Sequence, residues 1–102
     1  MTPEDFRSKL KEEKIVPLSR DEWDALAPEF PEKERHNTQL AGDLILVTVD
    51  GEWVAVEEPS PQARTARRLG NEEEARAFVA KRLDEYERMW DGCGVKVEYY
   101  ED

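Results

Sequence analysis

The clearest pattern of hydrophobic and polar positions lies between residues 44 and 57, where two apolar runs flank the dipeptide Asp50-Gly51. Asp-Gly is favoured in a two-residue type I′ hairpin turn, because both turn positions need a positive φ. Such a turn also fixes the register of the two strands. The expected partners are Val49 with Glu52, Thr48 with Trp53, Val47 with Val54, and Ile45 with Val56.

This register gives the hairpin two different faces. The first is a core face of Ile45, Val47, Val49, Val54 and Val56. The second is mixed but still largely apolar, with Leu44, Leu46, Thr48, Trp53, Ala55 and Glu57. An uncovered apolar patch of Leu44, Leu46 and Trp53 is typical of an interface. Two alternatives follow for the second face: residues 15–30 fold over it, or it contacts a partner protein.

Helix signals flank the hairpin on both sides. Thr2 and Pro3 begin a helix that extends to about Glu13, and the Ser19–Glu22 capping box begins a short helix from Arg20 to Ala27. Asn71 caps a long helix that Gly92 ends. The apolar positions of the long helix repeat about every 3.6 residues: Ala75, Phe78, Val79, Leu83, Tyr86, Met89 and Trp90.

The remaining segments complete the predicted fold. Residues 29–43 are polar and without period, which predicts a flexible loop. Residues 64–70, "RTARRLG", predict a third strand, and residues 95–100, "VKVEYY", predict a last one. Residues 1–102 are therefore expected to form one small α+β domain. Its mainly antiparallel sheet of three to four strands would pack under one long C-terminal helix, with short N-terminal helices.

Composition narrows the class of partner. The formal net charge is -10 at pH 7, which disfavours binding to nucleic acid or to an anionic membrane and suits a basic protein partner. The order of helix, three strands and helix is similar to that of a double-stranded-RNA-binding domain. However, Glu72, Glu73 and Glu74 stand at the start of the long helix, where such a domain has lysines. A single cysteine and the absence of an apolar leader indicate a cytoplasmic protein.

Candidate reactive groups are few. Cys93 follows the end of the long helix, whose negative dipole and Asp91 both oppose a thiolate, so it is interpreted as a small residue in a turn. His36 is interpreted as a solvated loop histidine. The sequence shows no phosphate loop, nucleophile elbow or metal-binding motif. We therefore predict no catalytic, cofactor-binding or metal-binding residues, and favour a protein that is not an enzyme.

The predicted binding residues are Leu44, Leu46 and Trp53 together with the basic cluster Arg64, Arg67 and Arg68. The arginines suit an acidic partner or anion, or they neutralise carboxylates of the same chain such as Glu57 and Glu58. The first functional hypothesis is a non-enzymatic, cytoplasmic protein-interaction module, in one version a homodimer. The alternative is an acidic inhibitor or immunity-type protein that blocks a basic, nucleic-acid-binding partner. A third hypothesis is a small enzyme that uses carboxylates and the arginine cluster.

Overall fold

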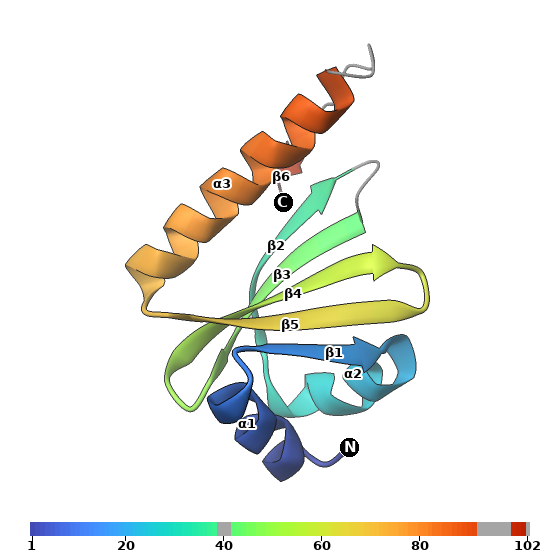
Figure 1. Cartoon of the computed structure of the whole chain (residues 1–102), viewed down its shortest axis with the longest axis vertical. Coiled ribbons are helices and arrows are strands. Elements are labelled where there is room, and N and C mark those ends of the chain that lie inside the picture. The colour runs from blue at the N-terminus through green and yellow to red at the C-terminus, as the bar shows by residue number, and fades with distance from the viewer. Residues whose placement is uncertain (39–41, 92–98, 102) are drawn as a thin grey trace.

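The computed structural model describes residues 1–38, 42–91 and 99–101, which form an antiparallel sheet with helices on both faces (Figure 1). The strands lie in the order β1-β5-β4-β3-β2-β6. Five of them have five to nine residues and β6 has three. The elements along the chain are α1 (Pro3–Glu12), β1 (Ile15–Ser19), α2 (Arg20–Leu26), the 3-10 turn η1 (Ala27–Glu29), β2 (Glu32–Thr38), β3 (Gly42–Val49), β4 (Glu52–Ser60), β5 (Ala63–Gly70), α3 (Glu72–Asp91) and β6 (Tyr99–Glu101).

The α+β class is confirmed, but the sheet is larger than the three to four strands expected. Strand β2 lies within residues 29–43, for which a loop was expected, and this part of the prediction was wrong. All seven residues of β2 are polar or charged, so no apolar alternation marks the strand. Ion pairs to neighbouring elements help to hold it, because Arg35 of β2 bonds Asp43 of β3 and Glu34 of β2 bonds Arg76 of α3.

Strand β1 was also missed, because Pro17 interrupts its short sequence "IVPLS". Proline has no N–H to donate, so it is tolerated at the edge of a sheet. β1 is such an edge strand and pairs with β5, with Ile15 opposite Arg67 and Pro17 opposite Thr65.

The predicted hairpin is confirmed in turn and register. Asp50 and Gly51 both have positive φ, at 51° and 81°, and Val49 lies opposite Glu52. The pairs Thr48 with Trp53, Val47 with Val54 and Ile45 with Val56 follow, as the turn requires. The third predicted strand, at residues 64–70, is β5.

The predicted helix starts are confirmed as well. Thr2 and Ser19 each form a capping box with the residue three positions on, and Asn71 Oδ1 accepts the backbone N–H of Glu74 at 2.8 Å. α3 extends to Asp91, while Cys93, the expected stop at Gly92 and residues 95–98 of the predicted last strand lie outside the described residues.

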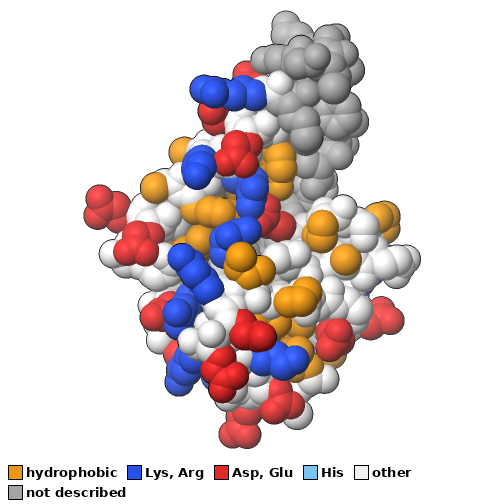
Figure 2. All heavy atoms as spheres, viewed as in Figure 1, with side chains coloured by type: hydrophobic (Ala, Val, Ile, Leu, Met, Phe, Trp, Pro, Cys, Tyr) orange, Lys and Arg blue, Asp and Glu red, His pale blue; other side chains and the backbone are white. Residues whose placement is uncertain are grey.

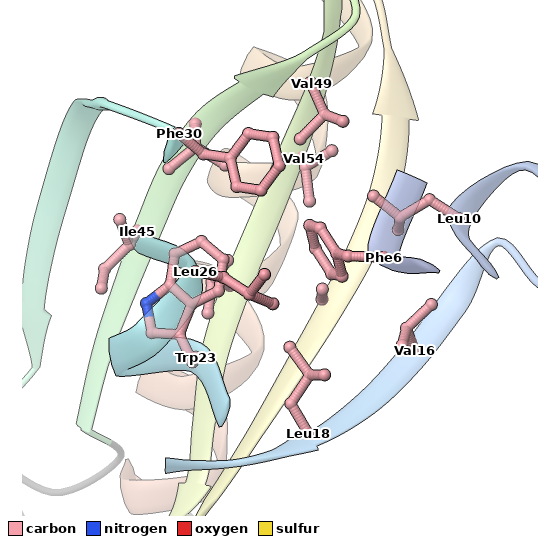
Figure 3. Packing of buried hydrophobic residues seen from close by; sticks show 13 residues of the cluster. Phe6, Leu10, Val16, Leu18, Trp23, Leu26, Phe30, Ile45, Val49 and Val54 are labelled. Carbon is pink, nitrogen blue, oxygen red and sulfur yellow. The ribbon is translucent and has the colours of Figure 1, made fainter. Parts of the chain in front are cut away.

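The larger core lies between the sheet and the N-terminal helices (Figure 3). α1 contributes Phe6 and Leu10, whose exposed fractions are 0% and 2%, and the ring of Phe6 lies 5.4 Å from that of Phe30. These side chains cover the aliphatic core face predicted for the hairpin: Ile45, Val47, Val49, Val54 and Val56.

The second face of the hairpin lies under α3. Leu44, Leu46 and Ala55 form a buried cluster with Val79 of α3, and Trp53, Leu69, Phe78 and Leu83 pack around it. Residues 15–30 were considered as the cover for this face, and that alternative is wrong because their buried side chains pack on the opposite face. α3 therefore separates this half of the sheet from solvent.

Candidate functional site

The six residues predicted to bind a partner do not lie on one surface. Leu44 and Leu46 have exposed fractions of 1% and 0% beneath α3, so a partner would reach them only if α3 left the sheet. Trp53 is half-buried, and the guanidinium of Arg76 lies 5.8 Å above its ring.

The sheet separates the three arginines of β5. Side chains alternate along a strand, so Arg64 and Arg68 point to the α1 and α2 side while Arg67 points to α3. Each lies near a carboxylate of β4: Arg64 is 3.8 Å from Glu58, Arg67 is 3.9 Å from Glu57, and Arg68 is 3.7 Å from Glu52. The arrangement matches the alternative in which these arginines neutralise carboxylates of the same chain.

Glu57 is the buried carboxylate of the described chain, with an exposed fraction of 9% between β4 and α3. Its Oε2 accepts the O–H of Tyr86 at 2.9 Å, and its Oε1 accepts an Nη2–H of Arg82 at 3.2 Å. The guanidinium groups of Arg67 and Arg82 lie 5.4 Å and 5.1 Å from the ring of Phe78. We call Glu57, Arg67, Phe78, Arg82 and Tyr86 the Glu57 cluster.

The geometry of the Glu57 cluster suits anchoring of α3. Burial, followed by the charge and hydrogen bond of Glu57, raises the pKa of Tyr86 to about 12. A phenol with so high a pKa stays protonated at neutral pH and donates to Glu57. The carboxylate is in turn held between two guanidinium groups.

His36, expected in a solvated loop, instead lies in β2 with 15% of its side chain exposed. Its Nε2 lies 2.6 Å from Oε1 of Glu34, whose other oxygen accepts from Arg76 of α3. Burial raises the pKa of Glu34, but the hydrogen bonds from Arg76 and His36 outweigh it and leave that pKa below its ordinary value. The missed strand hid this contact between β2 and α3 from sequence reasoning.

One part of the α3 side of the sheet is not covered by α3. α3 packs on β4 and β5, while β1 continues the sheet beyond them. There Ile15 is 42% exposed, and Pro17 beside it is also exposed. Figure 2 shows hydrophobic side chains over β1 and β5 beside a column of Lys and Arg side chains that descends from α3. We call this region the β1–β5 surface, formed by Ile15, Pro17, Ala63, Thr65 and Arg67.

The outer edge of β1 offers few hydrogen-bond donors. The backbone bonds from Arg68 N to Lys14 O (2.8 Å) and from Arg20 N to Gln62 O (2.9 Å) show that the even-numbered positions pair with β5. The backbone N–H and C=O groups of the odd-numbered residues of β1 therefore point away from β5, toward the open edge of the sheet. Pro17 has no N–H, and the N–H of Ser19 donates to Glu22 at 3.0 Å. A further strand would find few donors along this edge.

All nine arginines of the chain form ion pairs with carboxylates of the same chain. Nine exposed carboxylates have no ion pair among the described residues: Glu4, Asp5, Glu12, Glu13, Asp21, Glu29, Glu73, Glu74 and Glu87. Five exposed lysines likewise have no ion pair among the described residues: Lys9, Lys11, Lys14, Lys33 and Lys81. The uncompensated surface charge is therefore mostly negative.

Within residues 1–38, 42–91 and 99–101, no three His, Cys, Asp or Glu side chains converge as metal ligands would. No helix in the same residues has the length and hydropathy to cross a membrane. Comparisons of the chain with family models, with curated proteins and with solved structures found no match.

Proposed function

We propose that this protein is a non-enzymatic, cytoplasmic protein-interaction module that contacts its partner through the β1–β5 surface. The observation that supports the proposal is the exposure of Ile15 and Pro17 on a sheet face that α3 leaves uncovered. Exposed apolar side chains with a charged border are typical of protein interfaces. Arg67 provides part of that border, and its own charge is already compensated by Glu57.

The simplest partner is a second copy of the chain. A twofold axis would place two β1–β5 surfaces face to face, so that Ile15 of each copy is removed from water. Each copy carries a net charge of -10, and this repulsion opposes the dimer. Salt screens the repulsion, so a dimer formed by apolar contact strengthens as the salt concentration rises.

Size-exclusion chromatography with light scattering tests this proposal at about 50 mM and about 500 mM salt. We expect wild-type protein to become more dimeric at the higher salt, and Ile15→Lys to remain a monomer. Ala80→Lys is the matched control, because it adds the same charge at an exposed position of α3. If the wild type is a monomer in both buffers, and affinity purification from the native host recovers the same proteins with wild type and Ile15→Lys, the β1–β5 surface is not the contact.

A second candidate is an acidic inhibitor or immunity-type protein that blocks a basic, nucleic-acid-binding partner. The observation that favours it is the set of nine exposed carboxylates that form no ion pair with an arginine among the described residues. This candidate predicts the opposite salt dependence, because attraction between opposite charges weakens as salt screens it. Affinity purification at the same two salt concentrations separates the two: partners lost at high salt support the inhibitor, and partners retained contradict it.

A further inference from the structure

On the face of the sheet opposite α3, helix α1 lies beside the turn of the β3–β4 hairpin (Figure 1). A cavity of about 230 Å³ opens there, and we call it the α1 pocket. Ligand sites for whole small molecules have volumes of about 300–1,000 Å³. The α1 pocket is smaller, and its size suits a single aliphatic or aromatic side chain.

The floor of the α1 pocket is apolar and rigid. It consists of Leu10, Val49 and Val54, whose exposed fractions are 2%, 5% and 1%. All three belong to the larger core, and Figure 3 shows Leu10 of α1 facing Val49 and Val54 of the hairpin. An apolar group placed on this floor would bury its surface against side chains that are already fixed.

The rim of the pocket carries three cations and two carboxylates. Arg7 lies 3.2 Å from Asp50, and its guanidinium is 5.2 Å from the ring of Phe30. Arg68 lies 3.7 Å from Glu52. Within each of these two pairs, the charge of the arginine is offset by that of the carboxylate. The remaining cation is Lys11, which is exposed and forms no ion pair within the described chain.

Two larger hollows on the surface lack the combination of a buried apolar floor and a charged rim. One, of about 440 Å³, lies between Arg20 and the end of the β4–β5 hairpin, and another, of about 390 Å³, lies beside Met1 and Lys9. None of the residues that line either hollow is buried, so neither has an apolar floor.

We propose that the α1 pocket binds an apolar carboxylate. The apolar group lies on the floor of Leu10, Val49 and Val54, and the carboxylate pairs with Lys11 at the mouth. Two sources carry this chemistry: the end of a protein chain whose last residue is apolar, and a free short-chain carboxylic acid. The inference does not depend on the β1–β5 surface, because Arg67 and Arg68 point to opposite faces of β5.

NMR titration of the ¹⁵N-labelled full chain with N-acetyl-leucine tests the proposal. N-acetyl-leucinamide is the uncharged matched probe, and 4-methylpentanoate has the same side chain and carboxylate without the peptide group. We expect saturable shifts at residues 7–11 and 49–54, and about five-fold weaker binding of the amide. Tighter binding of N-acetyl-leucine than of 4-methylpentanoate identifies a chain end as the source, and equal binding identifies the free acid. Either result supports the pocket.

Variants of two neighbouring lysines complete the test. Lys11→Gln should weaken the binding of N-acetyl-leucine and of 4-methylpentanoate about five-fold, and it should leave the binding of N-acetyl-leucinamide unchanged. Lys9→Gln is the control, because Lys9 is also exposed in the last turn of α1 but does not line the pocket. The proposal is overturned if acid and amide bind equally, if the two variants behave alike, or if no shift saturates. Ile15→Lys should not change the titration, so failure of the pocket and failure of the β1–β5 surface are distinguishable.

Discussion

Replacing Glu57 with alanine tests whether the Glu57 cluster anchors α3 to the sheet. The substitution removes the acceptor for Tyr86 and Arg82, and it leaves Arg67 without its nearby carboxylate. Arg82 keeps a contact of 3.2 Å to Glu85, but that carboxylate is 46% exposed. Two guanidinium groups would then remain beside Phe78 with little compensation.

The expected cost follows from the exposure of the partners. Breaking a fully buried ion pair costs about 3–5 kcal/mol, and breaking an exposed one costs about 0–1 kcal/mol. The side chains of Glu57 and Arg82 are 11% and 23% exposed, which places the pair between these limits and nearer the buried one. We expect Glu57→Ala to lower the free energy of unfolding by about 2–3 kcal/mol. Glu57→Gln keeps an acceptor and should lose less.

Urea unfolding followed by circular dichroism measures this difference. Glu85→Ala is the control, because it removes the exposed carboxylate that contacts the same arginine, and it should cost less than about 0.5 kcal/mol. Equal losses in Glu57→Ala and Glu85→Ala would refute the reasoning, since burial would then not decide the value of the carboxylate. A loss below about 0.5 kcal/mol in Glu57→Ala would show that the cluster does not anchor α3.

Three further outcomes are expected. The pKa of Tyr86 is raised from 10 to about 12, so the stability that this side chain contributes is complete below about pH 10 and is lost between about pH 10 and 12. The urea midpoints of wild type and Tyr86→Phe should therefore converge across that range. Midpoints that stay equally far apart at every pH would contradict this expectation. The lowered pKa of Glu34 contributes stability that is present above its ordinary pKa of 4.5 and is lost as the pH falls through the lowered value. Arg76→Gln should therefore move acid unfolding, followed by circular dichroism, to higher pH, and an unchanged midpoint would argue against the bond to Glu34. Pro17→Val adds an outward N–H to the edge of β1, so light scattering should detect more self-association, and an unchanged mass would show that the proline does not protect this edge.

Local sequence signals decided the parts of the fold that depend on neighbouring residues. The β3–β4 register followed from Asp50-Gly51, because the turn needs two positive φ angles and admits one alignment of the strands. The helix starts followed from their caps in the same way. The opposite directions of Arg64 and Arg67 also follow from the alternation of side chains along the predicted strand, which divides the basic cluster between the two faces of the sheet.

Strands β1 and β2 of the fold depend on contacts between segments that are distant in the sequence. β2 has no apolar pattern, and its evidence is a set of ion pairs with β3 and α3 that no local window contains. β1 was hidden by Pro17, which is acceptable there only because β1 is an edge strand. The β1–β5 surface depends on the pairing of β1 with β5, and the α1 pocket depends on the packing of α1 against the β3–β4 hairpin and β5.

The sequence by itself determined the hairpin, the three helix starts, the α+β class and an acidic surface, because each depends on short-range geometry or on composition. Only the tertiary structure decided which helix covers which face. Both faces of the hairpin are apolar, and hydrophobic burial has no direction, so the pattern alone fits either assignment. Pairing of β1 with β5 brings α1 and α2 to one face, and the turn at Gly70 (φ of 100°) leads α3 onto the other. That choice buried Leu44 and Leu46 and left Ile15 exposed.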